Sequence, residues 1–267
     1  MSEKSPPAAQ QLFDLSGRVS LITGASGHLG RAMASALAEA GSRVIVASRT
    51  LDKARELAGS LGGAEQGKHL SVVIDHMDQA SIERGFADAI EKSGRIDVLV
   101  NNGHEPLGAD WKDVTGEQFT RQLANLTGYF LLARLTRANA VARHAQASII
   151  MLGSMYGQVA SYPEAYEGLG PASPAAYQAL KGGVIQLTRH LAVYWAGDGV
   201  RVNCISPGPF PAPGALPKLI ERLEARSPMH RMGRPHEIKG AIVFLASDAS
   251  SYVTGHNLAV DGGWTAW

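Results

Sequence analysis

Short β-branched runs alternate with longer Ala-rich stretches of helical periodicity along almost the whole chain, and this alternation constrains the fold more than any other feature. Runs such as 96–100 and 148–152 are almost continuously apolar, which is typical of strands buried on both faces of a parallel sheet. Helix-length connections between such strands predict right-handed βαβ units. Strands are expected at 18–23, 43–48, 69–75, 96–101, 147–153, 200–205 and 257–260.

Helices are expected between these strands, at 29–40, 51–60, 79–93, 116–143, 174–197 and 235–247. This order predicts an α/β protein built on a single doubly wound parallel sheet, the Rossmann fold, with about seven strands and helices on both faces. We interpret residues 1–11 as a flexible N-terminal tail and residues 12–267 as one domain. In such sheets the ligand crevice lies beyond the carboxyl ends of the strands, so the residues that follow each strand are the functional candidates.

Charge and composition exclude several classes of partner. The 25 basic and 24 acidic residues give a formal net charge of +1 without Lys or Arg runs, so neither nucleic acid nor an acidic membrane surface is expected as a partner. No apolar run approaches the roughly 20 residues of a membrane span, and the opening residues lack the apolar core of a secretory signal. The single cysteine, Cys204, is expected to be a packed core thiol, so the sequence predicts neither a disulfide nor a metal site. The lack of a disulfide fits a reducing compartment, and we expect a cytoplasmic location.

A glycine-rich turn follows the first predicted strand. Residues 23–30 read Thr-Gly-Ala-Ser-Gly-His-Leu-Gly and lead directly into an Ala-rich helix. Glycines here let the backbone approach a pyrophosphate, whose charge is stabilised by free N–H groups and the helix dipole. A tight structural turn is the alternative, but the position after the first strand favours a dinucleotide. The predicted contacts are Gly24, Ser26, Gly27, His28, Leu29 and Gly30.

The second predicted strand ends in Ser48 and Arg49, where NAD-binding proteins usually place a carboxylate on the adenosine ribose. A hydroxyl beside a guanidinium suits a 2′-phosphate instead. We therefore expect NADP(H) to be the preferred cofactor, with NAD(H) still possible. An ordinary solvated arginine at a strand end is the alternative interpretation.

Tyr177 and Lys181 lie four residues apart in a predicted helix and therefore share one face. A phenol titrates near pH 10, too high for efficient base catalysis at neutral pH. A positive charge about 4 Å away, at an effective dielectric of 20, is worth roughly 4 kcal/mol and would lower that pKa by up to about three units. Ser154 ends the preceding strand and can donate to a substrate oxygen. Each feature alone also suits a solvated helix face or a turn, whereas their combination with the glycine turn favours a catalytic site.

Taken together, these motifs resemble the short-chain dehydrogenase/reductase family from about Leu15 to Trp267. The resemblance rests on the 23–30 turn, Asp75, Asn-Asn-Gly at 101–103, Asn125, Ser154, Tyr177 with Lys181, Pro207-Gly208 and Asp-Gly-Gly at 261–263. It implies a dinucleotide-binding and catalytic Rossmann domain. The activity it implies is NAD(P)(H)-dependent hydride transfer that interconverts an alcohol and a carbonyl, and the assembly it implies is a homotetramer.

The resemblance also implies roles for single residues. The catalytic tetrad would be Asn125, Ser154, Tyr177 and Lys181. Tyr177 would be the acid/base, Lys181 would also hold the nicotinamide ribose, and Asn125 would organise a proton-relay water. Asp75 would meet the adenine and Asn101 would brace the sheet. Further cofactor contacts would come from His76, Asn102, Gly103, Tyr177, Lys181, Pro207, Gly208 and Phe210.

Several positions depart from the family pattern. His28 stands where the middle glycine of the turn is expected, and His104 replaces the glycine of the usual Asn-Asn-Ala-Gly. Pro209 and Pro211 remove backbone donors, which leaves the Phe210 N–H as the expected carboxamide contact. The apolar-aromatic end, residues 264–267, suits burial at a subunit contact.

The interval between Ser154 and Tyr177 is longer than the common family form and carries several Tyr and Glu residues. It resembles the branch that acts on sugars and sugar acids, which is gluconate 5-dehydrogenase-like. Because both anchors lie at the crevice, we expect loop 155–174 to enclose a small polyol, sugar or sugar acid, with its hydroxyls and carboxylates near that substrate. Packing of the loop at a subunit interface is the alternative.

Two other functions are compatible with the sequence. A 3-oxoacyl-(acyl carrier protein) reductase would need a cationic landing surface, for which Arg121, Arg134 and Arg137 on one predicted helix are candidates. A non-catalytic dinucleotide-sensing regulator would keep the glycine turn without needing the tetrad. All four tetrad positions carry chemically competent residues, which favours an enzyme.

Overall fold

A seven-stranded parallel sheet forms the centre of the computed structural model, which describes residues 6–170 and 174–267. Its strand order is β3-β2-β1-β4-β5-β6-β7. Every residue of the central strands β1, β4 and β5 is buried, as their uninterrupted apolar runs predict. The strands are β1 (Val19–Thr23), β2 (Arg43–Ser48), β3 (Leu70–Val73), β4 (Val98–Asn101), β5 (Ala147–Leu152), β6 (Val200–Pro207) and β7 (Asn257–Val260).

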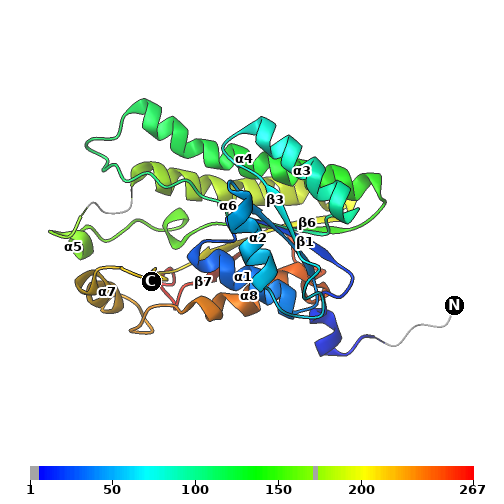
Figure 1. Ribbon diagram of the computed structural model, residues 1–267. Helices are drawn as coiled ribbons and strands as arrows, with labels where there is room; N and C mark the ends of the chain where they lie inside the picture. The colour runs from blue at the N-terminus through cyan, green and yellow to red at the C-terminus, as the bar shows by residue number, and fades with distance from the viewer. Residues whose placement is uncertain (1–5, 171–173) are drawn as a thin grey trace.

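Helices cover both faces of the sheet (Figure 1). One face packs against α1 (His28–Glu39), α2 (Leu51–Ser60) and α8 (Lys239–Ala246). The other face packs against α3 (Gln79–Ser93), α4 (Gly116–Ala142) and α6 (Ala175–Trp195). Each face has its own apolar core, in which Leu37 and Leu245 represent the first and Phe86 and Leu191 the second. The doubly wound sheet predicted from the sequence is therefore confirmed.

Two further helices lie in segments that the sequence pattern had not assigned to helix. The short α5 (Pro163–Tyr166) lies within the long interval between Ser154 and Tyr177, and α7 (Pro217–Glu224) follows β6. Cys204 is fully buried in β6, which confirms the predicted core thiol. Among the described residues, no helix combines the length and apolar character needed to cross a membrane.

Candidate active site

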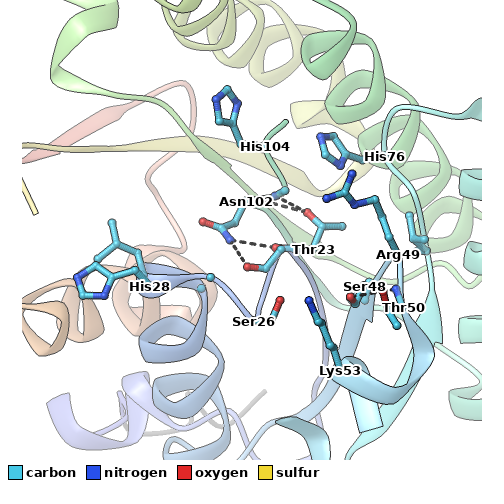
Figure 2. Close-up of a pocket in the computed structure, with 17 residues that line it drawn as sticks. Thr23, Ser26, His28, Ser48, Arg49, Thr50, Lys53, His76, Asn102 and His104 are labelled. Carbon is cyan, nitrogen blue, oxygen red and sulfur yellow. Dashed lines mark hydrogen bonds between the residues drawn. The ribbon is translucent and has the colours of Figure 1, made fainter. Parts of the chain in front are cut away.

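A cleft of about 340 Å³ opens beyond the carboxyl ends of the first four strands (Figure 2). The structure brings together at this cleft most of the residues predicted for a dinucleotide. All six predicted turn residues line it, together with Ser48, Arg49, His76, Asn102 and Gly103.

The glycine turn leaves room that side chains would fill. Gly24 has a φ of 62°, and a Cβ added there would lie 2.8 Å from the Gly103 Cα. A Cβ on Gly30 would collide with the Gly24 carbonyl oxygen. The Asn102 amide donates to the Thr23 and Gly24 carbonyls at 3.1 and 2.9 Å, which ties the turn to the end of β4. This bare backbone at the start of α1 fits the pyrophosphate of a dinucleotide.

Two cations and a hydroxyl meet at one end of the cleft. Ser48 ends β2, Arg49 follows it, and Lys53 of α2 lines the same end of the cleft (Figure 2). Sequence reasoning missed Lys53, although its place four residues after Arg49, at the start of a predicted helix, was a usable signal. Arg49 is largely exposed, and its Nη1 lies 3.7 Å from Glu105 Oε2. His28 lies at the opposite end of the cleft from Arg49, where it begins α1 (Figure 2).

Three of the predicted tetrad residues lie around the end of β5 and the start of α6, where Ser154 and Lys181 are buried and Tyr177 is half-buried. The Lys181 Nζ donates to the Leu152 carbonyl at 2.7 Å, and it lies 5.6 Å from the centroid of the Tyr177 ring. The Ser154 hydroxyl accepts a hydrogen bond from the Tyr156 N–H at 3.1 Å. This leaves the Ser154 proton free to be donated elsewhere.

Burial controls the protonation of these groups. Burial raises the pKa of Tyr177, while the nearby Ser154 hydroxyl lowers it. Burial also lowers the pKa of Lys181 to about 8. The pKa of Tyr177 therefore lies above its ordinary value, because the cost of charging this partly buried phenol dominates. That Lys181 lowers this pKa stays a prediction.

The side chain of Asn125, on α4, is saturated by hydrogen bonds within the protein. Its Oδ1 accepts from the Glu105 N–H and from His76 Nε2, both at 2.8 Å. Its Nδ2 donates to the carbonyls of Gln122 at 2.9 Å and Glu105 at 3.3 Å. The Asn125 amide thus holds three segments together and has no capacity left for a water.

His104 packs edge-to-face against Tyr177, with ring centroids 5.4 Å apart and an interplanar angle of 77°. Burial, reinforced by the Lys181 charge, lowers the pKa of His104 to about 3. The imidazole is therefore neutral at physiological pH. A polar ring thus borders the predicted acid/base at the position where the family usually has glycine.

Other predicted cofactor residues do not line this cleft, namely Asp75, Tyr177, Lys181, Pro207, Gly208 and Phe210. The Asp75 carboxylate accepts from the Met77 N–H at 3.0 Å and so shapes the turn after β3. The Gly208 N–H donates to the Val260 carbonyl at 3.0 Å. The Phe210 ring borders a separate hollow of about 400 Å³ beside Gly233.

The tyrosines of the long interval form an aromatic wall beside Tyr177. Tyr156 and Tyr166 share a hydrogen bond of 2.7 Å between their hydroxyls, and Tyr162 packs edge-on against Trp264 at 5.5 Å. All of them belong to one apolar cluster with Tyr177. Trp264 is only 1% exposed, so it is buried inside its own chain, and the predicted burial at a subunit contact is wrong for this residue.

The carboxylate of Glu164 forms an ion pair with an arginine. It is largely exposed and lies 3.8 Å from Arg226, two residues beyond the end of α7 (Pro217–Glu224). Arg222 of α7 donates to the carbonyls of Ala165 at 3.2 Å and Glu167 at 2.7 Å. That this carboxylate lies near the substrate stays a prediction, and its pairing with Arg226 favours an outward position.

The three arginines of α4 offer little free positive charge. Arg121 pairs with Glu105 at 2.6 Å, and Arg137 pairs with Asp198 at 2.6 Å. Arg134 stacks on the Phe130 ring at 5.4 Å. Two of the three cations proposed as a carrier-protein landing surface are thus neutralised.

The family model described as enoyl-(acyl carrier protein) reductase matches residues 24–265. Galactitol 2-dehydrogenase (L-tagatose-forming) of Cereibacter sphaeroides is 37% identical, covering 96% of this chain and 98% of its own length. D-threitol dehydrogenase of Mycolicibacterium smegmatis is 35% identical, covering 95% of each chain. The rhamnolipids biosynthesis 3-oxoacyl-[acyl-carrier-protein] reductase of Pseudomonas aeruginosa is 34% identical, covering 94% of this chain and 98% of its own.

Among solved structures, a gluconate 5-dehydrogenase from Burkholderia cenocepacia in complex with NADP and tartrate superposes with a TM-score of 0.86. It is 30% identical and covers 97% of this chain and 100% of its own. A short-chain dehydrogenase from Leptospira borgpetersenii with bound NAD+ has a TM-score of 0.84 and 28% identity, over 99% and 98% of the two chains. The chain belongs to the short-chain dehydrogenase/reductase family and is an oxidoreductase of the NAD(P)-dependent type.

Proposed function

We propose that this oxidoreductase interconverts a hydroxyl and a carbonyl group on a small polyol, sugar or sugar acid, with NADP(H) as the preferred cofactor. The observation that carries the proposal is the placement of Ser154, Tyr177 and Lys181 at the carboxyl edge of the same sheet as the glycine-lined cleft. Support for the substrate class comes from the galactitol and D-threitol dehydrogenases among the relatives.

The chain's own residues divide the cofactor between them. The backbone at Gly24, Gly27 and Gly30 would meet the pyrophosphate at the start of α1. Ser48, Arg49 and Lys53 would meet the 2′-phosphate, because two cations and a hydroxyl converge there. His76, Asn102 and Gly103 line the middle of the cleft. When bound, the nicotinamide would supply or accept the hydride.

In the proposed reaction Tyr177 Oη exchanges a proton with the substrate oxygen. Ser154 donates a hydrogen bond to that oxygen, since its own acceptor capacity already serves the Tyr156 N–H. Lys181 has a pKa of about 8, so it is mostly protonated at pH 7, and its charge favours the phenolate form of Tyr177 as the proton leaves. Asn125 fixes the segment that carries His104 against Tyr177.

The decisive experiment is an assay of polyols, sugar acids and 3-oxoacyl thioesters with both cofactors, on the wild type and on Tyr177→Phe. Turnover of the polyol or sugar-acid class should fall by several orders of magnitude in the variant, because the phenol proton is lost. The NADPH dissociation constant should stay nearly unchanged. Tyr252→Phe, a fully exposed tyrosine, is the matched control. Near-normal turnover by Tyr177→Phe would refute the assignment, and a wild type without turnover on any class would favour a dinucleotide sensor.

Cofactor preference is tested separately by Arg49→Asp. The new carboxylate would repel a 2′-phosphate and can accept hydrogen bonds from a ribose, so the preference should shift toward NAD(H). Calorimetric dissociation constants for NADPH and NADH provide the measurement. Equal or tighter binding of NADH by the unmodified protein would remove the NADP(H) preference.

A 3-oxoacyl-(acyl carrier protein) reductase is the second candidate, favoured by the similarity to the Pseudomonas aeruginosa enzyme. The pairing of Arg121 with Glu105 and of Arg137 with Asp198 weighs against it, since an acidic carrier would need free cations. Exclusive turnover of 3-oxoacyl thioesters in the substrate panel would replace the polyol proposal with this one.

The same proposal includes a homotetrameric assembly, a cytoplasmic location and one catalytic domain over residues 12–267. Exposed apolar side chains near the ends of α4 and α6 support association, because Val193 and Tyr194 are 78% and 70% exposed. Leu15, close to the start of this range, is fully buried in the same core as α1.

A further inference from the structure

His76 lies between the dinucleotide cleft and Asn125. It follows β3, lines the cleft, and is only 8% exposed (Figure 2). Two glycines make room for it: a Cβ on Gly103 would lie 3.0 Å from His76 Nδ1, and a Cβ on Gly128 would collide with the His76 carbonyl oxygen. The imidazole is therefore held in one place by close packing.

The hydrogen bonds around Asn125 fix which ring nitrogen of His76 carries a proton. The Glu105 N–H donates to Asn125 Oδ1 at 2.8 Å, so the amide oxygen faces that side. His76 Nε2 lies 2.8 Å from the same oxygen. Because an amide oxygen can only accept, Nε2 must donate. In the neutral ring Nδ1 is then an acceptor, and burial, which lowers the His76 pKa, favours that neutral form.

The remaining nitrogen has no protein partner. Within residues 6–170 and 174–267, His76 Nδ1 forms no hydrogen bond, and it is not among the fully buried unpaired atoms. Since the ring lines the cleft, Nδ1 is the polar atom of His76 that a bound molecule can meet. A hydroxyl or amino group of a dinucleotide is a donor of the required kind.

On the other side, Asn125 links His76 to the predicted acid/base. The Asn125 amide binds both the N–H and the carbonyl of Glu105. Glu105 directly follows His104, whose ring packs against Tyr177 at 5.4 Å. A continuous set of contacts therefore runs from the cleft through His76 and Asn125 to the neighbour of Tyr177.

We propose that His76 is a positioning residue that couples the dinucleotide to the catalytic centre, with Nδ1 accepting from the cofactor and Nε2–H fixing the Asn125 amide. This proposal rests on the proposed function, because it assumes that Asn125 and Tyr177 serve the reaction. Cofactor binding then tightens the hold of Asn125 on the segment that carries His104.

Two substitutions separate the two nitrogens. In His76→Gln the side-chain amide can still donate to Asn125, but the acceptor at Nδ1 is lost. In His76→Asn a polar atom remains near Nδ1, but the shorter side chain does not reach Asn125. The readouts are the NADPH dissociation constant, the hydrogen exchange of the Glu105 amide with and without NADPH, and kcat at saturating cofactor. The first two need no substrate, so they remain valid if the proposed reaction is wrong.

We expect His76→Gln to weaken NADPH binding about 2-fold to 10-fold, the size of one net hydrogen bond. In this variant NADPH should still slow exchange of the Glu105 amide. We expect His76→Asn to bind NADPH with less than about a 2-fold change, below the effect of one net hydrogen bond. This variant should lose the NADPH-dependent protection of Glu105, and its kcat should fall on the order of 10-fold to 100-fold, since Asn125 Oδ1 loses a buried donor.

Equal effects of the two variants on both binding and exchange would show that His76 only fills space, and would overturn the proposal. Unchanged Glu105 protection in His76→Asn would overturn it as well. His76→Leu keeps the buried volume and removes both nitrogens, so it should combine the two losses and provides a second test if His76→Asn does not fold. Melting temperatures and circular dichroism of each variant identify misfolding. Failure of the proposed function itself would appear only in the Tyr177→Phe assay.

Discussion

Lys181 is a charged group that the fold places where charge is costly. Its ammonium is buried, and its one hydrogen bond within the described residues goes to the Leu152 carbonyl. Burial lowers its pKa to about 8, from 10.5 for a free lysine. Buried titratable groups that no ion pair stabilises are typical of functional sites, because their cost to stability must be offset by a use. At Lys181 this cost can be measured.

The first prediction concerns the pH dependence of that cost. Between pH 8 and 10.5 the unfolded chain binds more protons at Lys181 than the folded chain, so this residue makes the free energy of unfolding rise with pH in that window. Below pH 8 the full cost, on the order of 3 kcal/mol, is present. The excess stability of Lys181→Met over the wild type should therefore shrink from pH 7 to pH 10.

Urea unfolding of both proteins at a series of pH values provides the measurement. The lost hydrogen bond to Leu152 changes the free energy of unfolding of Lys181→Met by an amount that varies little with pH. The slope of the stability difference against pH therefore reports the titration of Lys181. Groups that do not interact with Lys181, such as Arg201, whose pKa burial lowers to about 10, contribute to both proteins and cancel in the difference. A difference that stays flat from pH 7 to pH 10 would contradict the assigned pKa.

At the scale of elements, apolar periodicity in the sequence was sufficient to predict the bounds of strands and helices whose burial is uniform. Strands such as β2 and β5 and helices such as α2 and α3 begin and end within two residues of their predicted bounds. The pattern failed at α7, a short helix on the outside of the fold. There Pro217 at its first position and the spacing of Leu219, Ile220 and Leu223 were the available signals.

The site was predictable to the extent that it depends on chain order. The glycine turn and the Ser48-Arg49 pair follow strands directly, and the structure places them together at the cleft. The bond from His76 to Asn125 and the contact of Arg222 with α5 join segments 49 and about 57 residues apart. Such pairings depend on tertiary geometry, which local periodicity does not encode.

The second prediction concerns this contact between α7 and α5. Arg222 donates to the carbonyls of Ala165 and Glu167, and so holds the α5 segment beside the aromatic wall. Arg222→Ala removes these hydrogen bonds and should loosen that segment. The substrate KM should then rise on the order of 10-fold, because part of the binding free energy of the substrate is used to order the segment. The NADPH dissociation constant should not change, since the cleft lies on other elements.

Lys218→Ala is the matched control, because Lys218 is exposed on the same helix and has no ion-pair partner among the described residues. Steady-state kinetics with a polyol identified by the panel assay, and NADPH titration, provide the two measurements. Equal effects of the two alanine variants would show that α7 acts through overall charge. A change in NADPH affinity alone would mean that α7 serves the cofactor.

At the scale of the whole molecule, the cleft and the predicted catalytic residues occupy different strands along the same carboxyl edge of one sheet. The turns after β1, β2, β3 and β4 build the cleft proposed for the dinucleotide, whereas Ser154, Tyr177 and the aromatic wall follow β5. Helices α4 and α6 lie side by side on one face of this sheet (Figure 1). Arg137 of α4 pairs with Asp198 just beyond α6, which fixes the adjoining ends of these helices. Three apolar side chains are exposed near those ends, Val141, Val193 and Tyr194.

The last prediction is that these exposed side chains form a contact between copies of the chain. Tyr194→Asp places an unpaired charge in an apolar contact. This variant should therefore lower the mass measured by light scattering from that of a tetramer to that of a smaller species. Trp111→Asp is the matched control, because Trp111 is 69% exposed, like Tyr194, but lies beyond the carboxyl end of β4, away from the carboxyl ends of α4 and α6. Circular dichroism of both variants should equal that of the wild type. A monomeric wild type, or an equal loss of mass in both variants, would show that this face has another use.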